Sequence, residues 1–187
     1  MANEETADYG PLKLLIGTWK GDKGMDIAPK EKGQEENPYY ETIIFEKAGD
    51  VDNADKQTLA IVRYHLFVKE KANDEVSHDQ VGYWLWDKEN ETIIHSLTIP
   101  RGVSVIAGGK FDANNADKDA VTFNVNAKID GEWGIVQSPF MKNNAKTIEF
   151  TQELRVNATE LSYTQTMLLD IYGRSFEHTD DNVLTRV

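Results

Sequence analysis

Apolar and polar residues alternate along most of this chain, which is the pattern of β-strands that bury one face. The alternation is clearest over residues 59–69, 121–126 and 147–156. Runs rich in β-forming residues predict further strands at 42–47, 81–86, 92–99, 102–107, 133–137, 161–169 and 182–187. About ten strands at this spacing are typical of an antiparallel up-and-down barrel or of a two-sheet sandwich.

The clearest helical signal lies near the start of the chain. Pro11 favours the beginning of a short helical turn over 11–16, and Gly17 ends it. Residues 1–8 are expected to form a disordered tail. Residues 26–38 are expected to form an inserted loop, because they are charged and contain Pro29 and Pro38. The whole chain, 1–187, is expected to fold as a single domain.

A closed barrel explains this pattern better than a sandwich, because closure removes exposed sheet edges. A ring of about ten strands is too wide for side chains alone to fill, so it should keep a cavity for a small molecule. Gly17-Thr18-Trp19, opening the first strand, is typical of calycin barrels, and Arg186 is expected to stack on Trp19. The expected fold is therefore all-β: an antiparallel up-and-down β-barrel of the calycin type, with an N-terminal helical turn. A sandwich with a solid core is the alternative.

The charge and composition narrow the possible partners. The chain has 20 basic and 32 acidic side chains, a net charge of −12, which disfavours nucleic acids and anionic membranes. It has no cysteine, which excludes disulfides, zinc–thiolate sites, iron–sulfur clusters and thiol catalysis. The acidic N-terminus lacks the features of a signal peptide, so a cytoplasmic location is expected. The expected partner is a small-molecule ligand in the cavity, and a homodimer is one assembly that the sequence allows.

Four histidines are the candidate metal ligands, and none has the spacing of a multidentate metal motif: His65, His78, His95 and His178. A single neutral imidazole can still be the axial ligand of haem iron. His178 is expected in the connection before the last strand, where Asp180 could orient its ring. The alternative is that His178 is an ordinary structural or surface residue. His65 shares a face with Arg63, and we expect that pair to be solvated on the outside.

Several segments in order along nearly the whole chain resemble the nitrobindin-like haem-binding β-barrels, which are FABP-like in fold. The segments that carry the resemblance are 14–21 (LLIGTWKG), 78–83 (HDQVGY), 99–103 (IPRGV), 144–163 with Met167, and 176–178 (FEH). Each segment alone is only modestly specific for this family, whereas the order and spacing of all the segments together are much more specific.

The resemblance implies a ten-stranded barrel with haem b at one end. His178 matches the proximal iron ligand, His78 and Met167 match positions that line the haem pocket, and Ile99 is expected there too. It also implies ferric haem that binds nitric oxide and isomerises peroxynitrite to nitrate, with no general base from the protein.

The sequence departs from the family pattern at Asp22–Asp26 and the insertion through Tyr40, at Thr179, and by one extra residue between Met167 and His178. These departures keep two alternatives open. One is a non-enzymatic carrier of a small hydrophobic ligand such as a fatty acid, and the other is a structural or interaction module with a filled interior.

Overall fold

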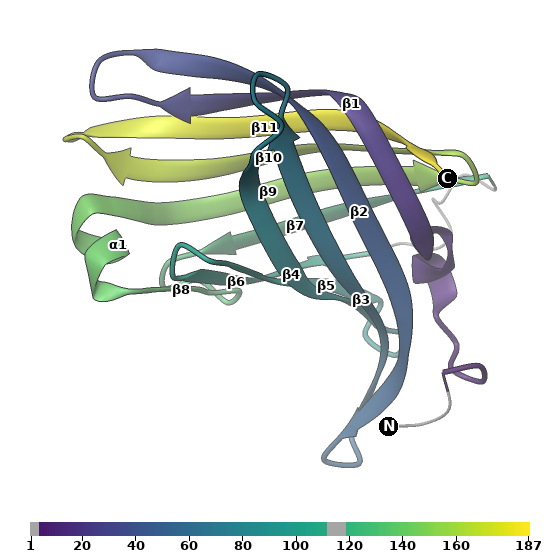
Figure 1. Ribbon diagram of the computed structural model, residues 1–187. Helices are drawn as coiled ribbons and strands as arrows, with labels where there is room; N and C mark the ends of the chain where they lie inside the picture. Colours follow the sequence, from purple (N-terminus) through teal and green to yellow (C-terminus); the bar gives the residue numbers. More distant parts are fainter. Residues whose placement is uncertain (1–3, 112–118) are drawn as a thin grey trace.

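The computed structural model describes residues 4–111 and 119–187, which form antiparallel strands with one 3₁₀ turn and one short α-helix (Figure 1). In chain order the elements are η1 (Gly10–Leu14), β1 (Gly17–Pro29), β2 (Gln34–Asn53), β3 (Gln57–Glu70), β4 (Val76–Asp87), β5 (Thr92–Ile99), β6 (Val103–Lys110), β7 (Ala120–Lys128), β8 (Ile135–Gln137), α1 (Pro139–Asn144), β9 (Ala145–Asn157), β10 (Glu160–Ile171) and β11 (Arg174–Arg186).

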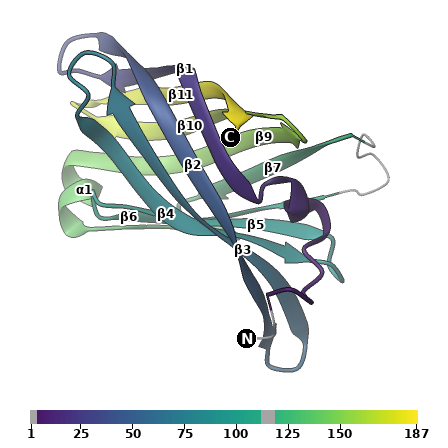
Figure 2. The same ribbon diagram turned by 45° about the vertical axis from the view of Figure 1, so that its right-hand side comes forward.

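The sheet closes on itself, which confirms the expected up-and-down barrel. Its strand order is β5-β4-β3-β2-β1-β11-β10-β9-β7-β6, and β5 also pairs with β6 (Figure 2). The short strand β8 pairs with β6 at residues 103–105, while β7 pairs with β6 near Gly108. Ten strands therefore make the ring, and β8 extends its β6 edge.

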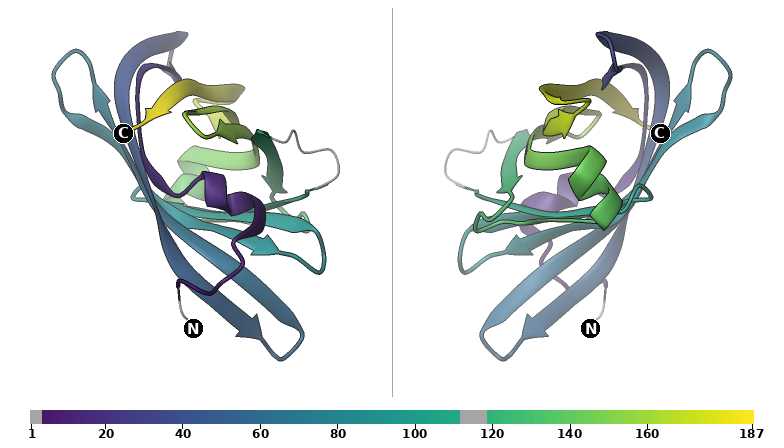
Figure 3. Two further views of the ribbon diagram at one scale, coloured as in Figure 1. Left: turned by 90° about the vertical axis from the view of Figure 1, so that its right-hand side faces the viewer. Right: turned by 90° about the vertical axis from the view of Figure 1, so that its left-hand side faces the viewer.

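The first and last strands meet where the barrel closes. Trp19 of β1 pairs with Arg186 of β11, and the Arg186 guanidinium lies 4.2 Å from the Trp19 ring centroid, as the sequence predicts. The turn η1 covers this end of the barrel; Leu12 within it and Leu15 directly after it are buried. Helix α1 lies at the opposite end (Figure 3), where Ser138 caps it by accepting a hydrogen bond from the Met141 amide.

The middle of the barrel is packed rather than hollow. The largest fully buried side chains include Trp84, Phe123, Phe150 and His95, and they share one core cluster or contact it. Trp84 and His95 stack with ring centroids 4.2 Å apart and planes 9° from parallel. The sequence predicts a wide cavity, and large aromatic side chains fill this part of it instead.

The expected loop at 26–38 is a hairpin. β1 continues to Pro29, β2 begins at Gln34, and the two pair from Gly24 to Pro29. Pro29 and Pro38 are tolerated because alternate residues of a strand point their N–H groups away from the partner.

The structure describes part of the segment at 1–8 that the sequence predicts to be a disordered tail. Residues 1–3 lie outside the described residues. Residues 4–8 form a turn in which Ala7 is buried, and the Glu4 carbonyl accepts a hydrogen bond from the Tyr9 hydroxyl.

Candidate functional site

His178 faces the inside of the barrel and is still reached by solvent. It lies within β11, not in a connection before it, and pairs with Met167 of β10. Paired residues on antiparallel strands project to the same face, and Met167 belongs to the buried core, so His178 points inward. Its side chain is nevertheless 32% exposed. We call the end of the barrel opposite η1, where solvent reaches this inward imidazole, the open end.

A carboxylate from β1 binds the His178 ring. Nε2 of His178 lies 2.6 Å from Oδ1 of Asp26, and Asn37 of β2 donates to the other Asp26 oxygen at 3.4 Å. Burial by itself raises the pKa of Asp26, but the hydrogen bond and charge of His178, together with the hydrogen bond from Asn37, leave that pKa below its ordinary value. Asp180, the carboxylate expected to orient the ring, instead accepts a hydrogen bond from Tyr39.

His78 reaches the same open end from the opposite wall. It pairs with the buried residue Val68 and therefore points inward, and its Nε2 lies 3.3 Å from Oε1 of Gln80. Burial lowers the pKa of His78, and the charges of Arg101 and His178 lower it further, so the imidazole is neutral near pH 7.

The remaining two predicted pocket residues supply apolar surface at this end. Met167 lies between His178 and the buried Phe150 in the strand pairing. Ile99 ends β5 and is buried in the same core cluster. All four residues predicted to line the pocket therefore point into the barrel: His178, His78, Met167 and Ile99. His178 has Met167 directly beside it, while Ile99 is on the other wall with His78.

A buried hydrogen-bond chain runs inward from His78 through Gln80 and Tyr64 to His95, and the sequence predicted a pocket position only for His78. Gln80 donates to the Tyr64 hydroxyl at 2.6 Å, and that hydroxyl lies 2.8 Å from Nε2 of His95. Burial lowers the pKa of His95 to about 3, so this ring is neutral. The alternation over 59–69 shows which residues share a face with Tyr64 but not whether that face is inside the barrel. A shift of the strand register by one residue exchanges the two faces.

A second buried network lies on the wall made by β2, β10 and β11. Glu41, which is 2% exposed, lies 3.1 Å from the Tyr163 hydroxyl and accepts a hydrogen bond from Asn182 at 2.7 Å. The Tyr163 and Tyr39 hydroxyls are 3.1 Å apart, and Tyr39 donates to Asp180. Burial raises the pKa of Glu41 to about 8 and that of Asp180 to about 6. The inner wall beside His178 is thus acidic and rich in hydroxyl groups.

A family model described as a THAP4-like, heme-binding beta-barrel domain matches residues 8–186. The chain belongs to this family of haem-binding β-barrel domains. The resemblance to haem-binding barrels expected from the sequence is therefore confirmed. Among solved structures, this THAP4-like domain is similar to the crystal structure of Rv2717c from M. tuberculosis, with a TM-score of 0.73 and 18% identity over 96% of this chain and 99% of that one. A comparison with curated protein sequences gives no match.

The open end of this THAP4-like domain has donor chemistry that suits haem. Porphyrin supplies four ligands to iron, so a single inward imidazole such as His178 is sufficient from the protein. Met167 and Ile99 add the apolar surface that a porphyrin face requires. Within residues 4–111 and 119–187, no group of three or more His, Cys, Asp or Glu side chains could hold a metal ion.

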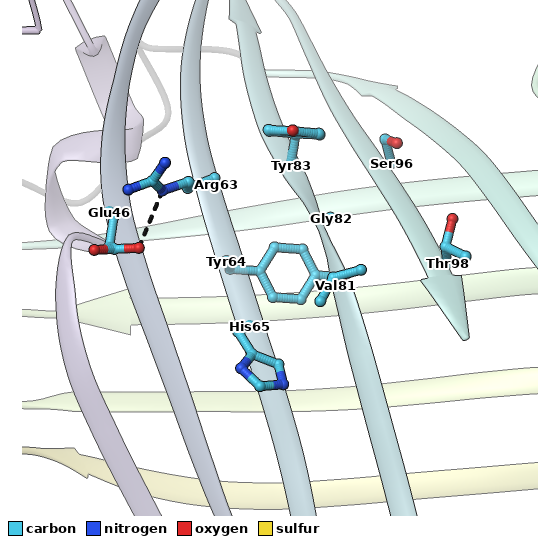
Figure 4. A pocket seen from close by; sticks show the side chains of 9 residues that line it. All are labelled: Glu46, Arg63, Tyr64, His65, Val81, Gly82, Tyr83, Ser96 and Thr98. Carbon is cyan, nitrogen blue, oxygen red and sulfur yellow. Dashed lines mark hydrogen bonds and ion pairs between the residues drawn. The ribbon is translucent and has the colours of Figure 1, made fainter. Parts of the chain in front are cut away.

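Two hollows on the THAP4-like domain lie on its outer surface. One, of ≈ 360 Å³, lies over β3, β4 and β5, where Arg63 donates to Glu46 and His65 projects outward (Figure 4). The outward orientation of His65 and Arg63 confirms the expectation that this pair is solvated. The other, of ≈ 480 Å³, is lined by residues of β7, β9 and β10 that are polar except for Val125.

Proposed function

We propose that this protein binds haem b at the open end of the barrel, with His178 as the axial ligand, and that the loaded protein binds nitric oxide and isomerises peroxynitrite to nitrate. The observation that carries the proposal is the His178 ring, which faces the barrel interior beside Met167 and is still 32% exposed. An inward imidazole that solvent can reach is also one that a ligand entering the barrel can reach.

The residues of the open end have separable tasks. His178 would hold the iron, while Met167 and Ile99 cover the porphyrin with apolar surface and exclude water. His78 is neutral near pH 7 and engages Gln80, so it adds a polar group without adding charge. When bound, ferric haem supplies an iron centre that binds nitric oxide and acts as a Lewis acid toward a peroxide oxygen.

The buried wall disfavours a ligand, such as a fatty acid, that brings its carboxylate into the barrel interior. In the described part of the chain, the buried polar residues include no Lys or Arg: Glu41, Gln80, Asp87, His95, Gln137, Thr147, Gln152 and Asn182. A fatty-acid carboxylate drawn into this interior would meet carboxyl groups and no buried cation, which is costly. A carrier of an uncharged apolar ligand remains the alternative.

Haemin titration tests the ligand and the site together. The wild-type protein should develop a sharp Soret band, and His178→Ala should lose or shift it. His65→Ala is the matched control, because it removes an imidazole from the outer face. A Soret band identical in wild type and His178→Ala would show that His178 is not the ligand.

The reaction is tested separately with haem-loaded protein. Peroxynitrite should decay faster with wild type than with buffer, and the nitrate yield should rise at the expense of nitrite. Equal decay rates and product ratios with and without the loaded protein would contradict the proposed isomerisation while leaving haem binding intact.

A further inference from the structure

The nitrogen of His178 that is best placed to bind iron already has a partner. Nε2 is at the tip of the side chain, whereas Nδ1 is next to Cβ and close to the β11 backbone. A broad planar porphyrin reaches the tip nitrogen with fewer clashes. In this structure Nε2 is instead hydrogen-bonded to Oδ1 of Asp26 at 2.6 Å.

We propose that Asp26 is a positioning residue that holds His178 in the ligand-free barrel and must release Nε2 before iron can bind. This inference rests on the proposed function and deepens it, since it names a step that haem loading requires. Asp26 sets the ring orientation from the neighbouring strand, and the same contact competes with the metal for one nitrogen.

The Asp26 carboxylate is itself held in place. Its other oxygen accepts a hydrogen bond from Asn37, and the paired strands β1 and β2 carry the two residues opposite each other. Asp26 is 31% exposed, so it can turn toward solvent once displaced. Release is therefore a local change of two side chains that leaves the strands paired.

The test compares Asp26→Asn with Asp181→Asn in haemin titrations and stopped-flow binding. Asp181 is an exposed residue three positions from His178, so the control removes the same charge without the contact to the ring. Asp26→Asn should bind haemin about 10-fold more tightly than Asp181→Asn, the size expected for a lost charge-assisted hydrogen bond. Asp26→Ala, which removes the contact completely, should bind at least as tightly as Asp26→Asn.

A second measurement examines the protein without haem. In ¹⁵N NMR spectra of histidine-labelled wild type, Nε2 of His178 should carry a hydrogen-bonded proton, and this signal should shift in Asp26→Asn and stay in place in Asp181→Asn.

The outcomes separate this inference from the proposed function. A Soret band that survives unchanged in His178→Ala refutes the proposed function whatever Asp26 does. A band lost in His178→Ala, with Asp26→Asn binding haemin no more tightly than Asp181→Asn, overturns the role of Asp26 alone. Weaker binding by Asp26→Asn overturns it too, because Asp26 would then support the ligand and not compete with iron.

Discussion

Glu41 illustrates how a single buried residue can determine a hydrogen-bond network. The Tyr163 hydroxyl lies within hydrogen-bond distance of both Glu41 and Tyr39, and Tyr39 donates its only proton to Asp180. If Glu41 were ionised, Tyr163 would donate to it and no proton would remain between the two tyrosines. A protonated Glu41 resolves this, because each group can then donate to the next, from Glu41 through Tyr163 and Tyr39 to Asp180.

Glu41 should therefore make stability fall as pH rises. Its pKa is about 8 in the folded protein against an ordinary 4.5, so between these values the folded state keeps a proton that the unfolded state releases. This group alone lowers the unfolding free energy by about 1.4 kcal/mol per pH unit in that window. In urea unfolding at pH 5.5, 6.5 and 7.5, Glu41→Gln should show a flatter pH dependence than wild type. The exposed Glu46→Gln is the control, and parallel curves for wild type and Glu41→Gln would refute the assignment.

At the scale of elements, the β1–β2 hairpin supports the site. Asp26 and Gly24 are on β1, and their partners Asn37 and Tyr39 are on β2. A Cβ at Gly24 would fall inside the Tyr39 ring, so the absence of a side chain lets this ring lie across β1 and reach Asp180. The glycine is needed here for close approach, not for an unusual backbone angle.

Gly24→Ala should destabilise the protein by about 1–3 kcal/mol, because the Tyr39 ring must move and its hydrogen bond to Asp180 is lost. Gly134→Ala is the matched control, since nothing lies within 4 Å of its added methyl group, and it should change stability by less than about 0.5 kcal/mol. Chemical denaturation of both variants measures the difference. Equal free energies of unfolding for Gly24→Ala and Gly134→Ala would contradict this prediction, because the Tyr39 ring would then have moved at no cost in stability.

The alternating pattern located strands better than it located their ends. β11 begins at Arg174, well before the expected start at residue 182, because the inward residues His178 and Asp180 are polar and hide the alternation. The charged residues and the two prolines at 26–38 also obscured the alternation, so the hairpin there was not predicted. Asp26 could not be assigned from the sequence, because it lies 152 residues from His178 and only the β1–β11 pairing joins them.

At the scale of the whole molecule, Arg186 stabilises the end of the barrel that η1 covers. Its guanidinium covers Trp19 and donates to the carbonyls of Leu14, Ile16 and Ala158. These carbonyls belong to the η1 region and to the β9–β10 turn, so one side chain ties both of these parts to the last strand, β11.

Arg186→Ala should therefore lower the unfolding free energy by about 2–4 kcal/mol, since it removes several charge-assisted hydrogen bonds and the contact with the indole. Arg186→Lys should recover only a minor part, because an ammonium group cannot reach three carbonyls in the planar geometry of a guanidinium. Thermal unfolding of the two variants gives the comparison. Full recovery with lysine would show that charge alone is sufficient.

The barrel, its closure and the haem-binding family were all expected from the sequence and are confirmed. Cytoplasmic location, the exclusion of nucleic-acid and membrane partners, and a homodimer stay predictions. No helix in the described ranges is both long and apolar enough to cross a bilayer. A filled centre was expected only as an alternative, because strand alternation tells which residues face inward and not how much space they occupy.

The pairing of β1 with β11 also constrains how the protein is made. Until β11 leaves the ribosome, β1 has a free edge next to the nascent chain, and that edge can pair with a neighbouring polypeptide. Ring formation must then wait for the final strand of the domain, which makes folding a late and long-range event. Cells that produce this protein quickly would therefore benefit from a chaperone that shields β1 during translation.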